Sequence, residues 1–136
     1  MKKIVYVIAL LMFVVATSHA QKLNAAKVPV AVKSAFSKTH AKVSKVSWSK
    51  EDANFEAEFS LNGKETSEVY TAKGVFVESE VEMKASELPA AVKLKLKDQK
   101  ITEAAKITKA NGSVVYEAEI KGKDLLFDAN GNPVKL

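Results

Sequence analysis

The chain has 136 residues and a formal net charge of +5, with 21 basic residues against 16 acidic ones. It contains no cysteine, so disulfide bonds cannot stabilise it, and all of its 21 charged basic residues are lysines. Specific nucleic-acid and phosphate sites favour the guanidinium fork of arginine, so this composition argues against a nucleic-acid partner.

Residues 1–20 have the pattern of a secretory signal peptide. Lys2 and Lys3 precede an apolar run of 12 residues, Ile4 to Val15, and Ser18-His19-Ala20 places small residues at the cleavage positions. The rival interpretation is an uncleaved membrane anchor, but a helix needs about 20 apolar residues to cross a bilayer. No cysteine follows the run, which excludes a lipid anchor of the bacterial lipoprotein type. We therefore expect cleavage after Ala20 and a soluble periplasmic or secreted chain without a membrane anchor.

The rest of the chain indicates a tandem duplication. It has 116 residues, with 19 lysines and 16 acids, which suffice for one domain or for two small repeats that share a core. Four blocks recur in the same order: VPVAVKSAF (28–36) and LPAAVKLKL (88–96), FEAEF (55–59) and YEAEI (116–120), NGKE (62–65) and KGKD (121–124), and VYTAKG (69–74) and LFDANG (126–131). We predict a first unit at residues 21–84 and a second at residues 85–136, joined in one sheet.

Each unit is predicted to begin with a helix. Pro29 and Pro89 suit the first helical turn, where a missing N–H costs nothing. The apolar residues after each proline share one helical face: Val28, Val32, Ala35 and Phe36, then Leu88, Ala91, Val92 and Leu96. We expect both faces to cover a sheet.

Strands separated by tight turns are predicted to follow each helix. Apolar and polar residues alternate over these segments: 45–49, 55–61, 65–71 and 75–83 in the first unit, and 101–109, 114–120, 125–127 and 134–136 in the second. Short connections such as Asn62-Gly63 make neighbouring strands antiparallel. We therefore predict an α+β fold with one continuous antiparallel sheet of about eight strands, helices on one face and a second, open face in water.

The period of two assigns side chains to these two faces. Trp48 falls on the packed face, as do the apolar residues of FEAEF, whereas Glu56 and Glu58 fall on the open face. Phe76 shares its parity with Glu78, Glu80 and Glu82 and would be exposed there, unless it is a strand-end aromatic that covers a loop. In the second unit Glu117 and Glu119 take the places of Glu56 and Glu58.

The inventory of reactive side chains argues against an enzyme or a metal site. His40 is the only histidine after the predicted leader, and its polar surroundings favour a surface loop over a catalytic role. The chain has no glycine-framed serine, and one histidine without cysteines serves zinc poorly. We expect no cofactor.

The glutamate pairs could in principle perform glycosidase chemistry. Such chemistry needs one carboxyl group in a dry pocket so that the two pKa values separate. We expect an open sheet face to provide no such pocket, and lysines such as Lys45 and Lys64 to neutralise the row of glutamates.

The repeated motifs resemble those of a known family. VPVAVKSAF, FEAEF, NGKE, LPAAVKLKL, YEAEI and FDANG together resemble the PepSY-like proteins described as having a β-lactamase-inhibitor-protein-like (BLIP-like) fold, which are small exported proteins common in Bacteroidetes. The resemblance covers about Val28 to Lys135. It implies a tandem helix-plus-antiparallel-sheet fold and export to the periplasm or cell surface. It implies little about activity, and no binding residue is transferred from the inhibitor.

We therefore expect a non-enzymatic exported module that binds a protein or peptide of the cell envelope, with inhibition of a peptidase or other hydrolase as one form of that function. The alternative is a periplasmic ligand-sensing or envelope-structural protein without an enzyme target, and a glutamate-dependent hydrolase comes third. The predicted partner-binding residues lie on the open face: Glu56, Glu58, Phe76, Glu78, Glu80, Glu117 and Glu119.

Overall fold

The structure, a computed structural model, describes residues 21–135, so the predicted signal peptide and Leu136 lie outside the described residues. Its longer elements, in chain order, are β1 (Gln21–Leu23), α1 (Val30–Thr39), β2 (Ser47–Glu51), β3 (Asn54–Leu61), β4 (Lys64–Thr71), β5 (Phe76–Met83), α2 (Ala90–Lys95), β6 (Glu103–Lys109), β7 (Val114–Ile120) and β8 (Lys123–Phe127). Two short 3-10 helices, η1 (Ala25–Lys27) and η2 (Ala85–Glu87), precede α1 and α2. No helix of the described residues combines the length and apolar character needed to cross a membrane.

The described strands form one antiparallel sheet in the order β1 to β8, which confirms the predicted α+β fold with eight strands. The identity of the eighth strand was predicted wrongly. In place of the expected closing strand at residues 134–136, the described residues have one bridge between Phe127 and Pro133 and one backbone hydrogen bond from Val134 to Leu126. The eighth strand of the sheet is instead β1, which directly follows the predicted leader and pairs with β2.

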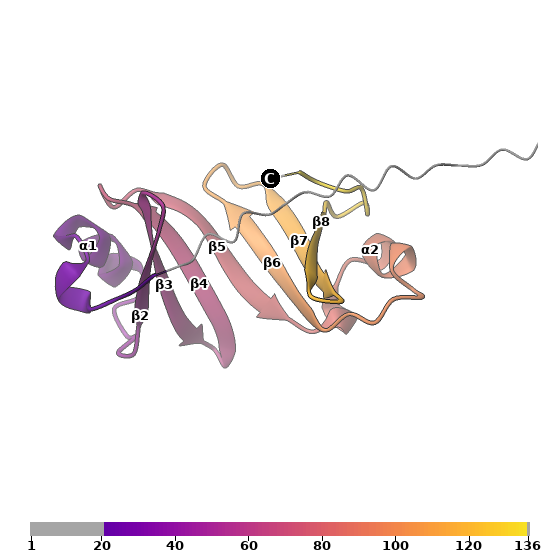
Figure 1. The fold of residues 1–136 in the computed structure, drawn as a ribbon, viewed down its shortest axis with the longest axis horizontal. Coiled ribbons are helices and arrows are strands. Elements are labelled where there is room, and N and C mark those ends of the chain that lie inside the picture. The colour runs from indigo at the N-terminus through magenta and orange to yellow at the C-terminus, as the bar shows by residue number, and fades with distance from the viewer. Residues whose placement is uncertain (1–20, 136) are drawn as a thin grey trace, which may run out of the picture.

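Both helices pack on the same face of the sheet, one near each end (Figure 1). The helices and the residues that flank them contribute Val28, Val32 and Phe36 to one cluster and Leu88, Val92 and Leu96 to the other. The first cluster includes Trp48, which is 8% exposed, as the parity of its strand predicts. The two units therefore share a sheet, while each helix covers its own group of apolar side chains.

A glycine at the same place in each unit explains why the blocks VYTAKG and LFDANG recur. Gly74 (φ +78°) and Gly131 (φ +79°) both lie in the left-handed region and against the first turn of α1 or α2. A Cβ atom on Gly74 would overlap the carbonyl oxygen of Ala31, and one on Gly131 would come within 2.9 Å of the carbonyl oxygen of Ala91. Only glycine fits such a backbone approach, because it has neither the Cβ atom nor the φ restriction.

A bulge in β5 overturns the predicted exposure of Phe76. Val69 pairs with Glu78, but the next residue, Tyr70, pairs with Phe76, so Val77 has no partner in β4 and the parity of the strand changes there. Phe76 therefore packs against the first core cluster, with its ring centroid 6.0 Å from that of Tyr70. Its inclusion among the residues of the open face was wrong.

Candidate functional site

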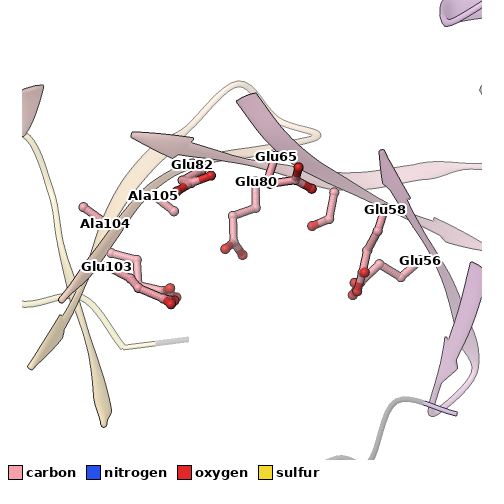
Figure 2. A pocket seen from close by; sticks show the side chains of 10 residues that line it. Glu56, Glu58, Glu65, Glu80, Glu82, Glu103, Ala104 and Ala105 are labelled. Atoms are coloured by element: carbon pink, nitrogen blue, oxygen red, sulfur yellow. The ribbon is translucent and has the colours of Figure 1, made fainter. Parts of the chain in front are cut away.

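The open face carries most of the acidic side chains of the protein. Strand registers place eleven carboxyl groups on it: Glu51, Glu56, Glu58, Glu65, Glu78, Glu80, Glu82, Glu103, Glu117, Glu119 and Asp124. The sheet arches, and the glutamates labelled in Figure 2 lie on the inner side of the arch. The open face is therefore concave rather than flat.

An acidic cavity lies at the centre of this face. Its volume is about 440 Å³, and it is lined by residues of β3, β4, β5, β6 and β7: Glu56, Glu58, Glu65, Ser67, Glu80, Glu82, Glu103, Ala104, Ala105 and Glu117. In Figure 2 the carboxyl groups of Glu56, Glu58, Glu80 and Glu103 point into the space enclosed by the arched strands. Side chains far apart in the sequence thus converge because the shared sheet curves across the junction of the two units.

Burial and mutual repulsion raise the pKa of several of these carboxyl groups. Burial, and then the neighbouring carboxyl group of Glu58, raises the pKa of Glu56 from 4.5 to about 7. Burial, and then the charge of Glu80, raises the pKa of Glu117 to the same value. The pKa of Glu80 is raised by burial and by the charge of Glu78. Glu80 contributes to the shifts of both Glu56 and Glu117, so the cavity behaves as one electrostatic unit.

The expected neutralisation by Lys45 and Lys64 was wrong. Lys45 lies in the exposed connection between α1 and β2, and Lys64 has helix-side parity and lies 3.8 Å from Glu87. Between described residues, the ion pair of Lys109 with Glu78 is the one that forms on the open face. The cavity itself was not foreseen, because parity assigns side chains to a face without giving its curvature.

Ser49 is the one described side chain with a buried polar atom that has no hydrogen-bond partner. The register places it opposite Glu56, so both side chains leave β2 and β3 on the open face. Ser49 is 6% exposed. A hydroxyl group that can both donate and accept a hydrogen bond is therefore left unsatisfied beside the acidic cavity.

The structure brings together four of the seven residues predicted for partner binding, namely Glu56, Glu58, Glu80 and Glu117, in the lining of the cavity. Glu78 and Glu119 lie on the same face outside this lining, where Lys109 pairs with Glu78 and the hydroxyl group of Thr102 donates to Glu119 at 2.8 Å. Phe76 lies on the other face.

Sequence reasoning missed several lining residues: Glu65, Ser67, Glu82, Glu103, Ala104 and Ala105. Glu65 and Glu103 follow from the same alternation when it is applied to β4 and β6, which lie between the strands of the predicted residues. Glu82 was already assigned to the correct face.

A second polar cluster lies beneath α1 on the packed face. His40 Nε2 is 2.8 Å from Glu68 Oε1, and the hydroxyl group of Tyr70 donates to Glu68 Oε2. The side chains of His40 and Glu68 are 9% and 10% exposed, and the imidazole ring packs on Phe36 and Phe59. The prediction of a surface-loop histidine was therefore wrong, because His40 ends α1 and turns inward over the sheet.

The side chains of this cluster are largely buried, and Glu68 is bonded to both of the others. Burial, and then the hydrogen bond to Glu68, raises the pKa of Tyr70, so its phenol stays protonated. Within residues 21–135 no group of three or more histidine, aspartate or glutamate side chains is arranged to hold a metal ion.

The comparisons with known proteins support the fold. No protein-family model matches the sequence, and no curated protein is significantly similar to it. A structure from Bacteroides eggerthii described as "putative periplasmic proteins" has a TM-score of 0.72 at 21% identity, over 79% of this chain and 86% of that one. A DUF2874 family protein from Bacteroides ovatus has a TM-score of 0.71 at 18% identity, over 79% and 84% of the two chains.

A third solved structure carries the name that the sequence motifs suggested. It is a BLIP-like protein from Bacteroides fragilis, with a TM-score of 0.64 at 17% identity, over 77% of this chain and 82% of that one. The predicted resemblance to BLIP-like proteins of Bacteroidetes is thereby confirmed for the fold.

Proposed function

We propose that this protein is a non-enzymatic binding module of the periplasm or cell surface that holds a segment of another polypeptide on its open face. The acidic cavity of about 440 Å³, lined from five adjacent strands, is the observation that carries the proposal. From β3 to β7 the sheet spans four inter-strand spacings, or roughly 19 Å. That distance matches about six residues of extended polypeptide.

The titration of the cavity favours binding over hydrolysis. An acid/base pair works when the environment drives two pKa values apart, so that one carboxyl group is protonated while its partner is ionised. Here Glu56 and Glu117 are both raised to about 7, and the pKa of Glu80 is raised as well. Groups that titrate together are suited to changing the charge of a surface rather than to dividing acid and base roles.

The proposed location and the inhibitory form of the function have separate support. Residues 1–20 have the pattern of a signal peptide, and the likeness to the B. eggerthii structure agrees with the periplasm. The likeness to a BLIP-like protein supports the inhibitory form of the function. In that form, the segment held on the open face belongs to an exported hydrolase, which the protein inhibits.

Site-specific cross-linking tests the proposal. A photoreactive amino acid replaces Ser67, which lines the cavity, or Ser34, which is exposed on α1 on the other face. The full chain is produced in its bacterial host and irradiated there. We expect a discrete protein adduct from position 67 and none from position 34. Equal adducts from both positions, or none from position 67, would refute binding by the open face. Stabilisation by a small-molecule panel without any adduct would favour the ligand-sensing alternative.

A further inference from the structure

We infer that the polypeptide segment held on the open face is basic, and that one of its lysine or arginine side chains enters the acidic cavity between Glu56, Glu80 and Glu117. This inference rests on the proposed function and names the chemistry of the partner. Three observations carry it: the distribution of charge between the two faces, an unsatisfied hydroxyl group beside the cavity, and the spread of the carboxyl groups over many strands.

Charge is segregated between the faces of the sheet. Over the whole chain the lysines outnumber the acids, yet the strands place only Lys22 and Lys109 beside the eleven carboxyl groups of the open face, and Lys109 is paired with Glu78. The other strand lysines have helix-side parity: Lys50, Lys64, Lys106 and Lys123. A concave surface of one sign attracts and orients a partner of the opposite sign.

Ser49 provides the second, independent observation. Its buried Oγ has no hydrogen-bond partner, although it lies opposite Glu56 on the open face. Buried polar groups without a partner are rare because they lose their hydration without compensation. An ammonium or guanidinium group brings several donors and no acceptor, so a cation bound by Glu56 can also donate to Ser49 once rotation of the Ser49 side chain exposes its hydroxyl group.

The spread of the carboxyl groups distinguishes a polypeptide from a metal ion. The cavity takes its carboxyl groups from β3, β4, β5, β6 and β7. Oxygen ligands of calcium all lie within about 2.6 Å of the ion, and within residues 21–135 no three such side chains are arranged to hold a metal ion. Carboxyl groups from five strands are matched by a peptide segment that places one cationic side chain in the cavity and others along the open face.

Protons are expected to compete with such a partner. Burial and like charges raise the pKa of Glu56 and of Glu117 to about 7, so both groups lose their charge as the pH falls through neutrality. Every strand contributes charged groups that face them: Lys22, Glu51, Glu58, Glu65, Glu78, Glu80, Glu82, Glu103, Lys109, Glu119 and Asp124. Because this environment is overwhelmingly negative, it favours protonation, which a bound cation opposes. Binding should therefore weaken as the pH falls from about 8 to about 6.

The test measures the affinity of the purified full chain for short fluorescent peptides by anisotropy. The peptides alternate serine with lysine, glutamine or glutamate, and are compared at low and high salt and at about pH 8 and pH 6. The double variant Glu56→Gln/Glu117→Gln removes two charges from the cavity. Asp52→Asn/Asp98→Asn is the matched control, because it removes two charges from connecting segments. Ser49→Ala removes the hydroxyl group without changing the charge.

We expect the lysine peptide to bind at least about tenfold more tightly than the other two at about pH 8, with affinity lost at high salt and at about pH 6. The cavity variant should lose most of this preference, the control should keep it, and Ser49→Ala should lower affinity without lowering the melting temperature. Equal affinity for the three peptides, no detectable binding of the lysine peptide, or the same loss in the control overturns the inference. So does calcium binding that displaces the peptide. If these peptide experiments fail but position 67 still forms a cross-link, the inference of a basic partner is wrong while the proposed function holds.

Discussion

The burial and mutual repulsion of carboxyl groups in the acidic cavity predict that removing charge there stabilises the protein. A rise in the pKa of Glu56 or Glu117 from 4.5 to about 7 corresponds to about 3 kcal/mol between the protonated and ionised forms. Both side chains are half-buried, so solvent screening reduces the expected gain in unfolding free energy to about 1 kcal/mol for each Glu→Gln substitution. For a chain of this length that gain corresponds to about 3–6 °C in melting temperature.

The sign of the pH dependence follows from proton linkage. Between about pH 4.5 and pH 7 the folded state holds protons on Glu56 and Glu117 that the unfolded chain has released. The folded state therefore binds more protons in this window, and the free energy of unfolding falls as the pH rises through it. The pKa values of Glu87 and Asp128 are lowered, by hydrogen bonds first, so their effects fall below about pH 4.5, outside the window.

Urea unfolding at low salt between about pH 5 and pH 8 is the appropriate assay, because guanidinium chloride would itself screen the charges. We expect Glu56→Gln/Glu117→Gln to match the unsubstituted protein near pH 5 and to exceed it by about 2 kcal/mol near pH 8. For Asp52→Asn/Asp98→Asn, the difference in unfolding free energy from the unsubstituted protein should not increase with pH. If the unfolding free energy of the unsubstituted protein is constant or rises between about pH 5 and pH 7, the account of the cavity is wrong.

Three further predictions concern the fold that carries the cavity. Gly74→Ala should destabilise the protein by about 2–4 kcal/mol, because the new side chain would have a positive φ and would overlap α1. Gly63→Ala should cost only about 1 kcal/mol, because Gly63 has φ +76° but nothing within 4 Å of the added Cβ atom. Thermal unfolding compares the two variants. Tyr70→Phe should cost about 1–3 kcal/mol by leaving an oxygen of Glu68 without its donor, and an unchanged denaturant midpoint would refute this role. Phe76→Ala should cost about 2 kcal/mol and leave lysine-peptide affinity unchanged, because the partly buried ring packs against the first core cluster. A selective loss of affinity would return Phe76 to the open face.

The architecture was predictable because four sequence blocks recur in the same order in the two halves of the chain. The two copies of the helix–strand pattern established the strands, their alternation and the packed face, and all of these depend on local periodicity. The strand β1 escaped prediction because three residues, Gln21–Leu23, carry no periodic signal of their own. The structure shows that β1 occupies the same place before the first helix as the end of β5 occupies before the second. Leu23 at the end of β1 pairs with Trp48 in β2, and Met83 at the end of β5 pairs with Ala104 in β6.

The features that were mispredicted depend on more than one strand. Parity cannot foresee the unpaired Val77, which moves Phe76 to the packed face, because that bulge is visible only in the pairing with β4. It also cannot foresee the arch of the sheet, which converts separate glutamates into one cavity with raised pKa values. The inward turn of His40 depends on Glu68, which lies 28 residues away in the chain.

The arrangement of charge argues that the open face serves recognition rather than solubility alone. Glu103 lies directly opposite Glu119, and Glu119 directly opposite Asp124, although like charges in such cross-strand pairs are destabilising. Solubility would be served equally well by a mixture of signs, and the chain has ample lysine to provide one. Instead, most of the strand lysines lie on the helix-covered face. Places where a sequence retains a local cost that simple substitutions could remove are characteristically functional. A basic partner would convert that repulsion into binding energy, which supports the proposal that the cavity recognises a cationic segment.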